Sequence, residues 1–282
     1  MAQRADLSGR TRLAIVLGDP VRHSLSPVIH NAAFAACGLD WVFLACEVPE
    51  GRVREALAGA TALGIDGLSV TMPHKAAVAA AVDELSATAR LLGAVNCVTR
   101  NGDRLVGHST DGDGFTDALA SEAGWSPAGA RCAVLGAGGA GRAVALALAD
   151  AGAAEVAVLN RTPHNAASAA ALAGDRGRVA APGEVGDFDL VVNATPLGMI
   201  GHGGPPMPLD PARLRRGQLL VDLVYEPAET ALLAAARQRG VRAFNGVRML
   251  VHQAARAFEL WTATEAPVET MVTATGEALA RR

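Results

Sequence analysis

The stretch Gly136-Ala137-Gly138-Gly139-Ala140-Gly141 decides the fold of this chain. The apolar run 131–135 leads into it, and a helix-like run to Asp150 follows. A buried strand that passes through a glycine turn into a helix offers backbone N–H groups and the positive end of the helix dipole to a pyrophosphate. We therefore predict a dinucleotide site here; the alternative is a tight strand-to-helix turn that binds nothing. The residues expected to contact the dinucleotide are Gly136, Ala137, Gly138, Gly139 and Ala140.

The position of this turn at mid-chain indicates a second domain. Roughly 130 residues precede it, more than a nucleotide-binding unit needs, and 282 residues are many for one core. Strand and helix patterns alternate on both sides of the turn, so the fold class is α/β. Asn101-Gly102 predicts a hairpin between two strands, which makes the first sheet mixed. We predict an N-terminal mixed-sheet α/β domain that holds a substrate, and a Rossmann-type doubly wound domain that holds the nucleotide.

The hydrophobic pattern and the turn residues give the expected elements. In the first part, strands are expected at 13–17, 41–48, 65–70, 95–100 and 104–107, and helices at 26–37, 53–63 and 75–81, with Ser26 as the cap of the first helix. A helix at 111–123 and a hinge at 124–129 lead to strands at 132–135, 156–160, 190–194, 219–223 and 242–244. The remaining tail is helical and is expected to pack on the first domain. The predicted domains are 1–110 with 247–282, and 111–246.

Charge and cysteine usage exclude several classes of protein. The formal net charge is −3, and the charges are interspersed without a basic cluster, so no nucleic acid partner is expected. The four cysteines and seven histidines show no ligand spacing, so neither a metal site nor a disulfide is expected. Without a signal-peptide pattern or an apolar run of about 18 residues, we expect a cytoplasmic protein with no membrane partner.

The end of the second strand in the nucleotide domain indicates which dinucleotide binds. An acidic residue there bonds a free ribose 2′-hydroxyl, whereas an arginine suits a 2′-phosphate. The chain has Asn160-Arg161-Thr162 at this position, and the planar, permanently charged guanidinium of Arg161 matches phosphate geometry. We therefore predict NADP as the cofactor, the alternative being a solvated surface arginine. The glycine-rich segment 201–206 is expected to be a loop that moves over a site.

Four polar clusters precede the glycine turn, each at a predicted strand end or loop: 24–27, 69–75, Asn96 and 109–112. Ligands of open α/β sheets gather at the carboxyl ends of strands. These clusters predict one pocket rich in hydroxyl and amide groups, with Lys75 and Asp111 as its titratable centre. Such a pocket suits a small polyhydroxylated acid. The alternatives are serines and Asp111 that cap helices, and a solvated Lys75.

The same clusters resemble the motifs of the shikimate dehydrogenase family. Residues 18–27 with His30-Asn31 are similar to its N-terminal motif, and 69–75 to its Asn-Val-Thr-x-Pro-x-Lys motif. The likeness continues in the family's order over nearly the whole chain. The further matching segments are 93–96, 110–112, the glycine turn with 160–162, 193–199, 222–227 and 249–254.

The resemblance implies reversible reduction of 3-dehydroshikimate to shikimate with NADPH, a step toward the aromatic amino acids. It implies that Lys75 exchanges the proton, with Asp111 beside it, as hydride moves in a cleft between the two domains. It also implies the binding residues. Ser24, Ser26 and Tyr225 would hold the substrate carboxylate, Thr71, Asn96, Asp111 and Gln253 its hydroxyls, and Thr195, Gly246 and Met249 would border the nicotinamide.

Three departures from the family motifs leave alternatives open. Ser69 and Ser109 replace asparagines, and these shorter side chains make quinate or an aminoshikimate an alternative substrate. Asn165 stands where a second basic residue is common in NADP-binding members, which leaves some tolerance of NAD. A catalytically silent NADP-binding sensor is the alternative of another class, although a pure binder has no need of Lys75 and Asp111. Monomer and homodimer are both compatible with the sequence.

Overall fold

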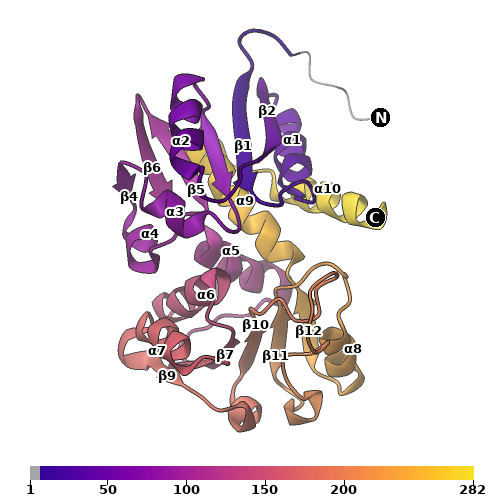
Figure 1. The fold of residues 1–282 in the computed structure, drawn as a ribbon. Coiled ribbons are helices and arrows are strands. Elements are labelled where there is room, and N and C mark those ends of the chain that lie inside the picture. Colours follow the sequence, from indigo (N-terminus) through magenta and orange to yellow (C-terminus); the bar gives the residue numbers. More distant parts are fainter. Residues whose placement is uncertain (1–6) are drawn as a thin grey trace. The chain divides into compact units, whose positions relative to one another are not determined.

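The computed structural model describes residues 7–282, which form two compact units (Figure 1). Unit 1 comprises the chain up to Thr110 together with Val251–Arg282, and unit 2 comprises Asp111–Leu250. The sequence placed the second boundary at Gly246 instead. The first turn of the helix that follows belongs to unit 2, because Met249 packs against the unit 2 core and Arg248 pairs with Glu122 at 2.8 Å.

Unit 1 contains a mixed six-stranded sheet in the order β2-β1-β3-β5-β6-β4. The sheet is parallel on the β2-β1-β3 side, whereas β5 runs antiparallel to both β3 and β6. The hairpin is centred on Gly102-Asp103, one residue later than predicted, because Asn101 still pairs with Arg104. The strands are β1 (Arg12–Gly18), β2 (Trp41–Glu47), β3 (Gly67–Val70), β4 (Glu84–Leu85), β5 (Cys97–Asn101) and β6 (Arg104–His108).

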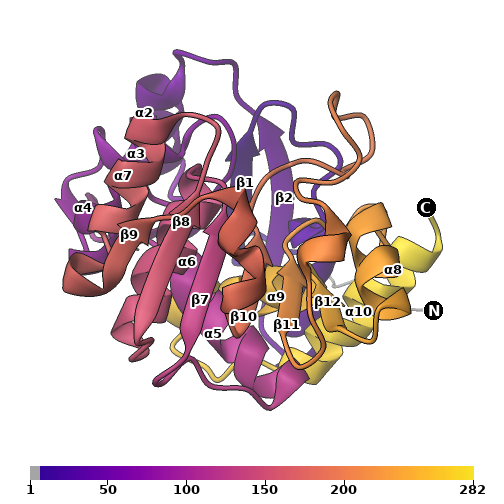
Figure 2. The same ribbon diagram turned by 90° about the horizontal axis from the view of Figure 1, so that it is seen from below.

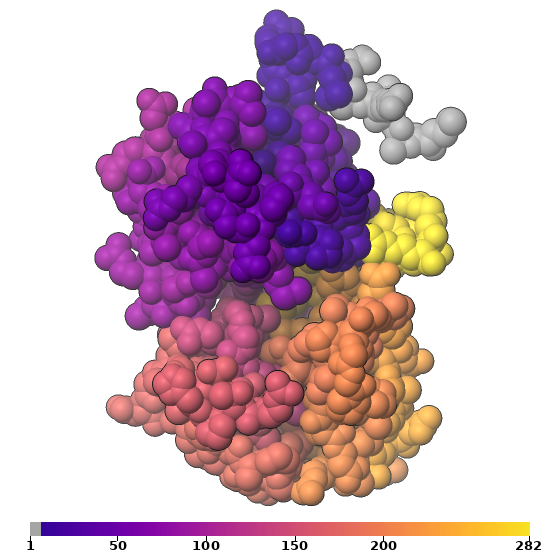
Figure 3. All heavy atoms as spheres, in the orientation of Figure 1, coloured from indigo at the N-terminus to yellow at the C-terminus, as the bar shows by residue number. Residues whose placement is uncertain are grey.

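The helical tail packs into unit 1, as expected from the sequence. The indole N–H of Trp261 donates to the carbonyl of Val98 at 3.0 Å, and its ring lies over Gly67. In Figure 3 the C-terminal residues, in yellow, lie at the surface beside indigo residues, and Arg282 donates to the carbonyl of His23 at 2.6 Å. The helices that carry unit 1 are α1 (Ser26–Ala36), α2 (Val53–Ala62), α3 (Lys75–Ala79), α4 (Ala87–Leu92), α9 (Val247–Thr262, shared with unit 2) and α10 (Val268–Ala280).

Unit 2 is a parallel six-stranded sheet in the order β12-β11-β10-β7-β8-β9, seen from below in Figure 2. With β7 as its first strand, this is the 3-2-1-4-5-6 order of the Rossmann fold, which confirms the predicted fold class. The strands are β7 (Arg131–Leu135), β8 (Glu155–Leu159), β9 (Gly177–Val179), β10 (Leu190–Asn193), β11 (Leu219–Asp222) and β12 (Arg242–Asn245).

The helices of unit 2 connect these parallel strands. The predicted helix at 111–123 is α-helical only to Ala118, and its last turn, Leu119–Ala123, is a π-helix. The helix after the glycine turn begins at Gly139, so half of that turn already belongs to the helix. The elements are α5 (Asp111–Ala118), α6 (Gly139–Asp150), α7 (Pro163–Ala171), α8 (Ala231–Gln238) and the 3₁₀ turns Gly174–Arg176, Pro182–Asp187 and Pro211–Arg213.

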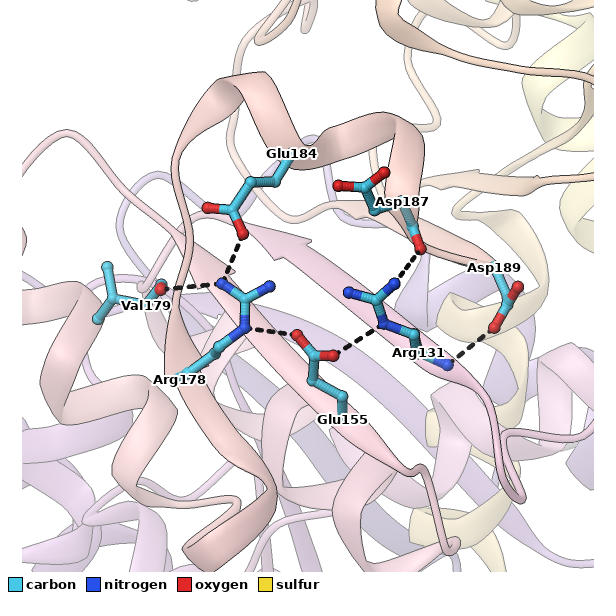
Figure 4. Close-up of polar contacts among 7 residues, drawn as sticks. All are labelled: Arg131, Glu155, Arg178, Val179, Glu184, Asp187 and Asp189. Atoms are coloured by element: carbon cyan, nitrogen blue, oxygen red, sulfur yellow. Dashed lines mark hydrogen bonds and ion pairs between the residues drawn. The ribbon is translucent and has the colours of Figure 1, made fainter.

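An ion-pair network clamps the amino-terminal edge of the unit 2 sheet (Figure 4). Glu155 at the start of β8 accepts hydrogen bonds from Arg131 at 2.8 Å and from Arg178 at 2.5 Å. Arg178 also pairs with Glu184 at 2.7 Å. Burial raises the pKa of Glu155, but the two arginines outweigh it and hold that pKa below its ordinary value. The network therefore ties β7, β8 and β9 together at the edge opposite the glycine turn.

Three features concern residues spread over both units: the cysteines, membrane-spanning helices and metal sites. All four cysteines are free; Cys97 and Cys132 are buried, whereas Cys37 and Cys46 are only partly so. Within residues 7–282, no helix combines the length and the apolar character needed to cross a membrane. Over the same range, no three histidine, cysteine, aspartate or glutamate side chains gather as a metal site.

Candidate functional site

The glycine turn closes tightly on itself while leaving part of its backbone open. Gly136 has φ of +104°, and a Cβ there would lie 3.0 Å from both Ala194 and Thr195. A Cβ on Gly141 would overlap the carbonyl oxygen of Gly136. At Gly138 and Gly139, in contrast, no described atom lies within 4 Å of an added Cβ. Glycine is thus needed for packing at the first pair of positions, and the second pair presents bare backbone to a ligand.

The amino terminus of α6 lies at this open backbone. Gly138 is its N-cap residue, with extended φ and ψ, and no side chain caps the helix. The first N–H groups of a helix have no partner within it, and they carry the positive end of its dipole. The 12-residue α6 and the bare glycines therefore fit a dinucleotide pyrophosphate.

The end of β8 lies against the same turn. The side chain of Asn160 accepts from the N–H of Ala137 at 3.3 Å and donates to the carbonyl of Thr162 at 3.1 Å. Arg161 and Thr162 are exposed. Because Asn160 holds the turn and the 160–162 loop together, Arg161 lies close to the glycine turn, at the end of the second strand of the sheet.

A pocket of about 590 Å³ opens along this edge of the unit 2 sheet. Gly136, Asn160, Arg161 and Thr195 line it, which brings four of the predicted cofactor residues to one cavity. His202 and Leu209 also line it. The expected loop at 201–206 was the only signal for this wall, and composition alone did not select His202 within it.

The remaining candidate residues of unit 2 lie after β10, after β11 and at the start of α9. Thr195 is half-buried, and Tyr225 is half-buried in the loop after β11. A Cβ on Gly246 would overlap the carbonyl of Leu223, and Met249 packs on the unit 2 core. Asp111, the first residue of α5, is buried.

In unit 1 the reversal of β5 gathers the polar clusters at one sheet edge. Ser69, Cys97 and His108 pair in register across β3, β5 and β6. The end of β3, the start of β5 and the end of β6 therefore coincide. Thr71, Asn96 and Thr110 extend from these three positions.

Asn96 is the hub of this edge. Its side chain accepts from the N–H of Thr110 at 2.7 Å and donates to the Thr110 hydroxyl at 2.9 Å. It also donates to the side chain of Gln253 at 3.2 Å, and the Thr110 hydroxyl donates to the Gln253 carbonyl at 3.0 Å. The structure thus joins Asn96 and Gln253, which are distant in sequence. Thr110, predicted only as part of a cluster, belongs to this group as well.

Lys75 begins α3 next to this hub. Its carbonyl accepts from the N–H of Val95 at 3.0 Å, and its side chain is half-buried. Lys75 is the only lysine in the chain; every other residue among the 25 lysines and arginines is an arginine. A sequence that otherwise uses arginine throughout keeps lysine at this one position, where a group that exchanges a proton is expected.

The serines lie where β1 leads into α1. The hydroxyl of Ser24 accepts from the N–H of Ser26 at 3.2 Å, and Ser26 is buried. The expectation that Ser26 caps α1 is wrong, because Leu25 occupies the N-cap position and makes no side-chain cap. The Ser26 hydroxyl is therefore not used to cap the helix.

Together the two units define a class of protein. A Rossmann sheet with an open glycine turn binds a dinucleotide, and a second unit presents a lysine and a hydrogen-bonding cluster at the carboxyl edge of its sheet. This is the organisation of a nicotinamide-dinucleotide-dependent oxidoreductase. The family model of the shikimate dehydrogenase substrate-binding domain matches residues 16–98, and that of the shikimate 5′-dehydrogenase C-terminal domain matches residues 246–274. The chain belongs to the shikimate dehydrogenase family, which confirms the resemblance.

Individual relatives cover nearly all of the chain. Shikimate dehydrogenase (NADP(+)) of Moorella thermoacetica is 48% identical, over 93% of this chain and 91% of that protein. The structure of shikimate 5-dehydrogenase from Thermus thermophilus with NADP(H) and shikimate is 38% identical, with a TM-score of 0.88 and coverage of 95% and 99%. Quinate dehydrogenase from Corynebacterium glutamicum in complex with NAD is 32% identical, with a TM-score of 0.87 and coverage of 95% and 99%.

Proposed function

We propose that this protein catalyses the reversible reduction of 3-dehydroshikimate to shikimate with NADPH, a step toward aromatic amino acids. The observation that carries the proposal is the hub of Asn96, Thr110 and Gln253 at the sheet edge where α3 begins with Lys75. Amide and hydroxyl groups there match a hydroxylated ring, and the lysine supplies a proton. The names of the relatives, which include shikimate and NADP, support the same substrate and cofactor.

The residues of unit 2 fit NADPH, which when bound supplies the hydride that the substrate's carbonyl carbon gains. The bare backbone at Gly138 and Gly139 and the start of α6 would hold the pyrophosphate. Arg161 would hold the 2′-phosphate, because a permanently charged guanidinium matches the charge and the oxygens of that group. Thr195, Gly246 and Met249 would border the nicotinamide, with Ala137, Ala140, Asn160 and Thr162 completing the site.

The residues that would act on the substrate come mainly from unit 1, with Asp111 and Tyr225 from unit 2. As its carbonyl carbon gains hydride, the carbonyl oxygen becomes an alkoxide unless a proton arrives, and the Lys75 ammonium both stabilises the charge and donates that proton. In the reverse direction, neutral Lys75 accepts it. Ser24, Ser26 and Tyr225 would hold the carboxylate, and Thr71, Asn96, Asp111 and Gln253 the hydroxyls, with Asp111 assisting Lys75. We propose a cytoplasmic monomer or homodimer.

Reduction of dehydroquinate to quinate is the second candidate. The similarity to a quinate dehydrogenase favours it, as do the shorter side chains of Ser69 and Ser109 in the substrate motifs. Quinate carries one more hydroxyl than shikimate, so a pocket with more room at these serines would admit it. The two acids are therefore compared directly.

The test is the oxidation of NADPH by purified protein, followed by absorbance, with 3-dehydroshikimate or 3-dehydroquinate as substrate. We expect kcat/KM to be at least about tenfold higher for 3-dehydroshikimate, which corresponds to one well-placed hydrogen bond. A higher kcat/KM for 3-dehydroquinate would establish the second candidate. No turnover of either acid, with NADPH still bound, would leave the catalytically silent sensor.

A further inference from the structure

Unit 2 contains a fully buried polar network to which the proposed mechanism gives no role. Asn193 ends β10, Asp222 ends β11, and Thr230 precedes α8. These three residues are 0%, 0% and 1% exposed. A carboxylate inside a sheet protein is costly unless hydrogen bonds compensate it. Its presence at the carboxyl edge of the sheet therefore calls for an explanation.

Three donors compensate Asp222. Its Oδ1 accepts from the side-chain amide of Asn193 at 2.8 Å and from the N–H of Val224 at 3.2 Å. Its Oδ2 accepts from the hydroxyl of Thr230 at 2.6 Å. Burial raises the pKa of Asp222 above its ordinary value, against the opposing effect of these three hydrogen bonds. One carboxylate thus ties the end of β10, the loop after β11 and the start of α8.

Asp222 also sets the orientation of Asn193. A carboxylate only accepts hydrogen bonds, so the NH₂ group of Asn193 must face it and the Asn193 oxygen must face the other way. That oxygen accepts from the N–H of Thr195 at 2.9 Å and from its hydroxyl at 2.6 Å. The rotamer of Thr195 is thereby fixed.

The fixed rotamer aims the Thr195 methyl group at the dinucleotide turn. Its Cγ2 lies 3.0 Å from where a Cβ on Gly136 would be, so it packs directly on the turn. The hydroxyl of Thr195 accepts from the N–H of Leu197 at 3.3 Å, which orders the rest of the loop. Thr195 lines the pocket, whereas Asn193 and Asp222 do not. The position of this lining residue therefore depends on Asp222, which acts on it through Asn193.

We infer that Asp222 is a positioning residue: through Asn193 it fixes Thr195 against the glycine turn, and through the N–H of Val224 it fixes the loop that carries Tyr225. The inference rests on the proposed function for the ligand contacts of Thr195 and Tyr225. Asp222 would thus determine the positions of the loops after β10 and β11 without touching either ligand.

The test compares Asp222→Leu with Gln218→Leu. Gln218 lies at the opposite end of the β11 segment, is equally buried, and also makes three side-chain hydrogen bonds, to the carbonyls of Val185 and Phe188 and from the N–H of Arg215. Both variants lose three hydrogen bonds and both lower the melting temperature. D222L should raise the Kd of NADPH by more than about tenfold and should also raise the KM for 3-dehydroshikimate. Both values for Q218L should stay within about twofold of those of the unaltered protein.

Asp222→Asn supplies the conservative rescue. Its amide oxygen still accepts from Asn193 and Val224, the two contacts that the inference uses, while its NH₂ group faces the Thr230 oxygen. The Kd of NADPH for D222N should therefore lie within about threefold of that of the unaltered protein. If D222L does not fold, Asn193→Leu, which removes the same link to Thr195, takes its place. A Kd for D222N raised as far as that of the leucine variant, or equal rises in the leucine variant and Q218L, would overturn the inference.

Calorimetric binding of NADPH separates this inference from the proposed function. The Kd comparison needs no substrate, so an unaltered protein that binds NADPH but turns over neither acid refutes the proposed reaction while the Kd values still test Asp222. An unaltered protein that does not bind NADPH refutes both.

Discussion

At the scale of single residues, replacing Lys75 by arginine distinguishes proton transfer from charge stabilisation. An arginine at this position keeps the positive charge, but a guanidinium does not give up its proton in proteins. We expect Lys75→Arg to lower kcat by about 10²-fold or more, as Lys75→Ala does, with a smaller change in the KM for the substrate. Steady-state kinetics measures both parameters, and turnover within tenfold of the unaltered enzyme would refute the role of Lys75 as proton donor.

The amino-acid usage of the chain offers an independent control for this prediction. Because Lys75 is the only lysine, an amine-reactive reagent labels only this side chain and the α-amino group. Turnover should fall in proportion to the fraction of Lys75 that is modified. Bound shikimate should slow the labelling of Lys75. Loss of activity in proportion to α-amino labelling, with Lys75 unmodified, contradicts the assignment.

At the same scale, we expect Arg161 to determine the preference for NADPH over NADH. It is exposed and lines the pocket of unit 2, so its removal should leave the fold intact. We expect Arg161→Ala to lower kcat/KM for NADPH about tenfold to a hundredfold, the value of one or two charge-assisted hydrogen bonds, and to leave kcat/KM for NADH within about twofold.

Asn165 provides the change in the opposite direction. It is exposed on α7, where some family members carry a second basic residue. Asn165→Arg should therefore raise the preference for NADPH over NADH. For the Arg161→Ala variant, an unchanged ratio of kcat/KM for NADPH to kcat/KM for NADH would show that Arg161 is a solvated surface residue.

At the scale of elements, the packing of α9 on β3 depends on one missing side chain. A Cβ on Gly67 would lie 2.6 Å from the ring of Trp261, which is itself held by the carbonyl of Val98. We expect Gly67→Ala to lower the free energy of unfolding by about 1–3 kcal/mol, since overpacking displaces the indole. Urea denaturation followed by tryptophan fluorescence measures the change.

Gly59 supplies the matched control on α2. No described atom lies within 4 Å of a Cβ added there, so Gly59→Ala should raise the free energy of unfolding by up to about 1 kcal/mol through helix propensity alone. If both alanine variants shift stability in the same direction, the contact between Gly67 and Trp261 does not limit packing.

Elements were predictable where a long pattern marks them. The strands β1 and β7 are continuous apolar runs, and α9 has a buried face repeated along its length, so local pattern was sufficient. β4 has two residues and β9 has three, too few to show a period. The π-turn at Leu119–Ala123 was also not predictable, because Glu122 and Ala123 obtain their contacts from Arg248 and Arg242, far along the chain.

At the scale of the whole molecule, the sequence identified residues but not their partners. Asn96 and Gln253 were each predicted to bind a hydroxyl, yet nothing local indicates that they bond each other, since the link depends on a tail that returns to the first sheet. Likewise Asp222 belonged to a matched motif, but its burial and its hold on Asn193 follow only from the adjacency of β10 and β11. Sequence motifs therefore identify residues with suitable side chains, whereas the topology of the fold determines which of them form hydrogen bonds with one another.

The pH dependence of folding follows from a titratable group in the core. His30 is fully buried, stacked on Phe43 at 4.4 Å and close to Trp261 at 4.9 Å. Neither ring nitrogen has a hydrogen-bond partner among residues 7–282. Burial lowers the pKa of His30 to about 3, from 6.5. Below pH 6.5 His30 therefore binds a proton in the unfolded chain but not in the folded chain, and the free energy of unfolding falls as the pH drops toward 3.

We expect His30→Leu, which removes the titration, to lessen this loss. Between pH 6.5 and 5 the unaltered protein should lose about 1.7 kcal/mol through His30, and the variant should not. The loss per pH unit rises from about 0.7 kcal/mol at pH 6.5 toward about 1.4 kcal/mol at lower pH, as the unfolded chain becomes fully protonated. Over this interval most carboxylates remain ionised, so the difference between the two proteins isolates the histidine. Urea denaturation at several pH values measures it, with the fluorescence of Trp41 and Trp261 reporting on unit 1. A difference in unfolding free energy that stays constant from pH 7 to 5 would mean that His30 is protonated in the folded protein, which its unpartnered, aromatic surroundings argue against.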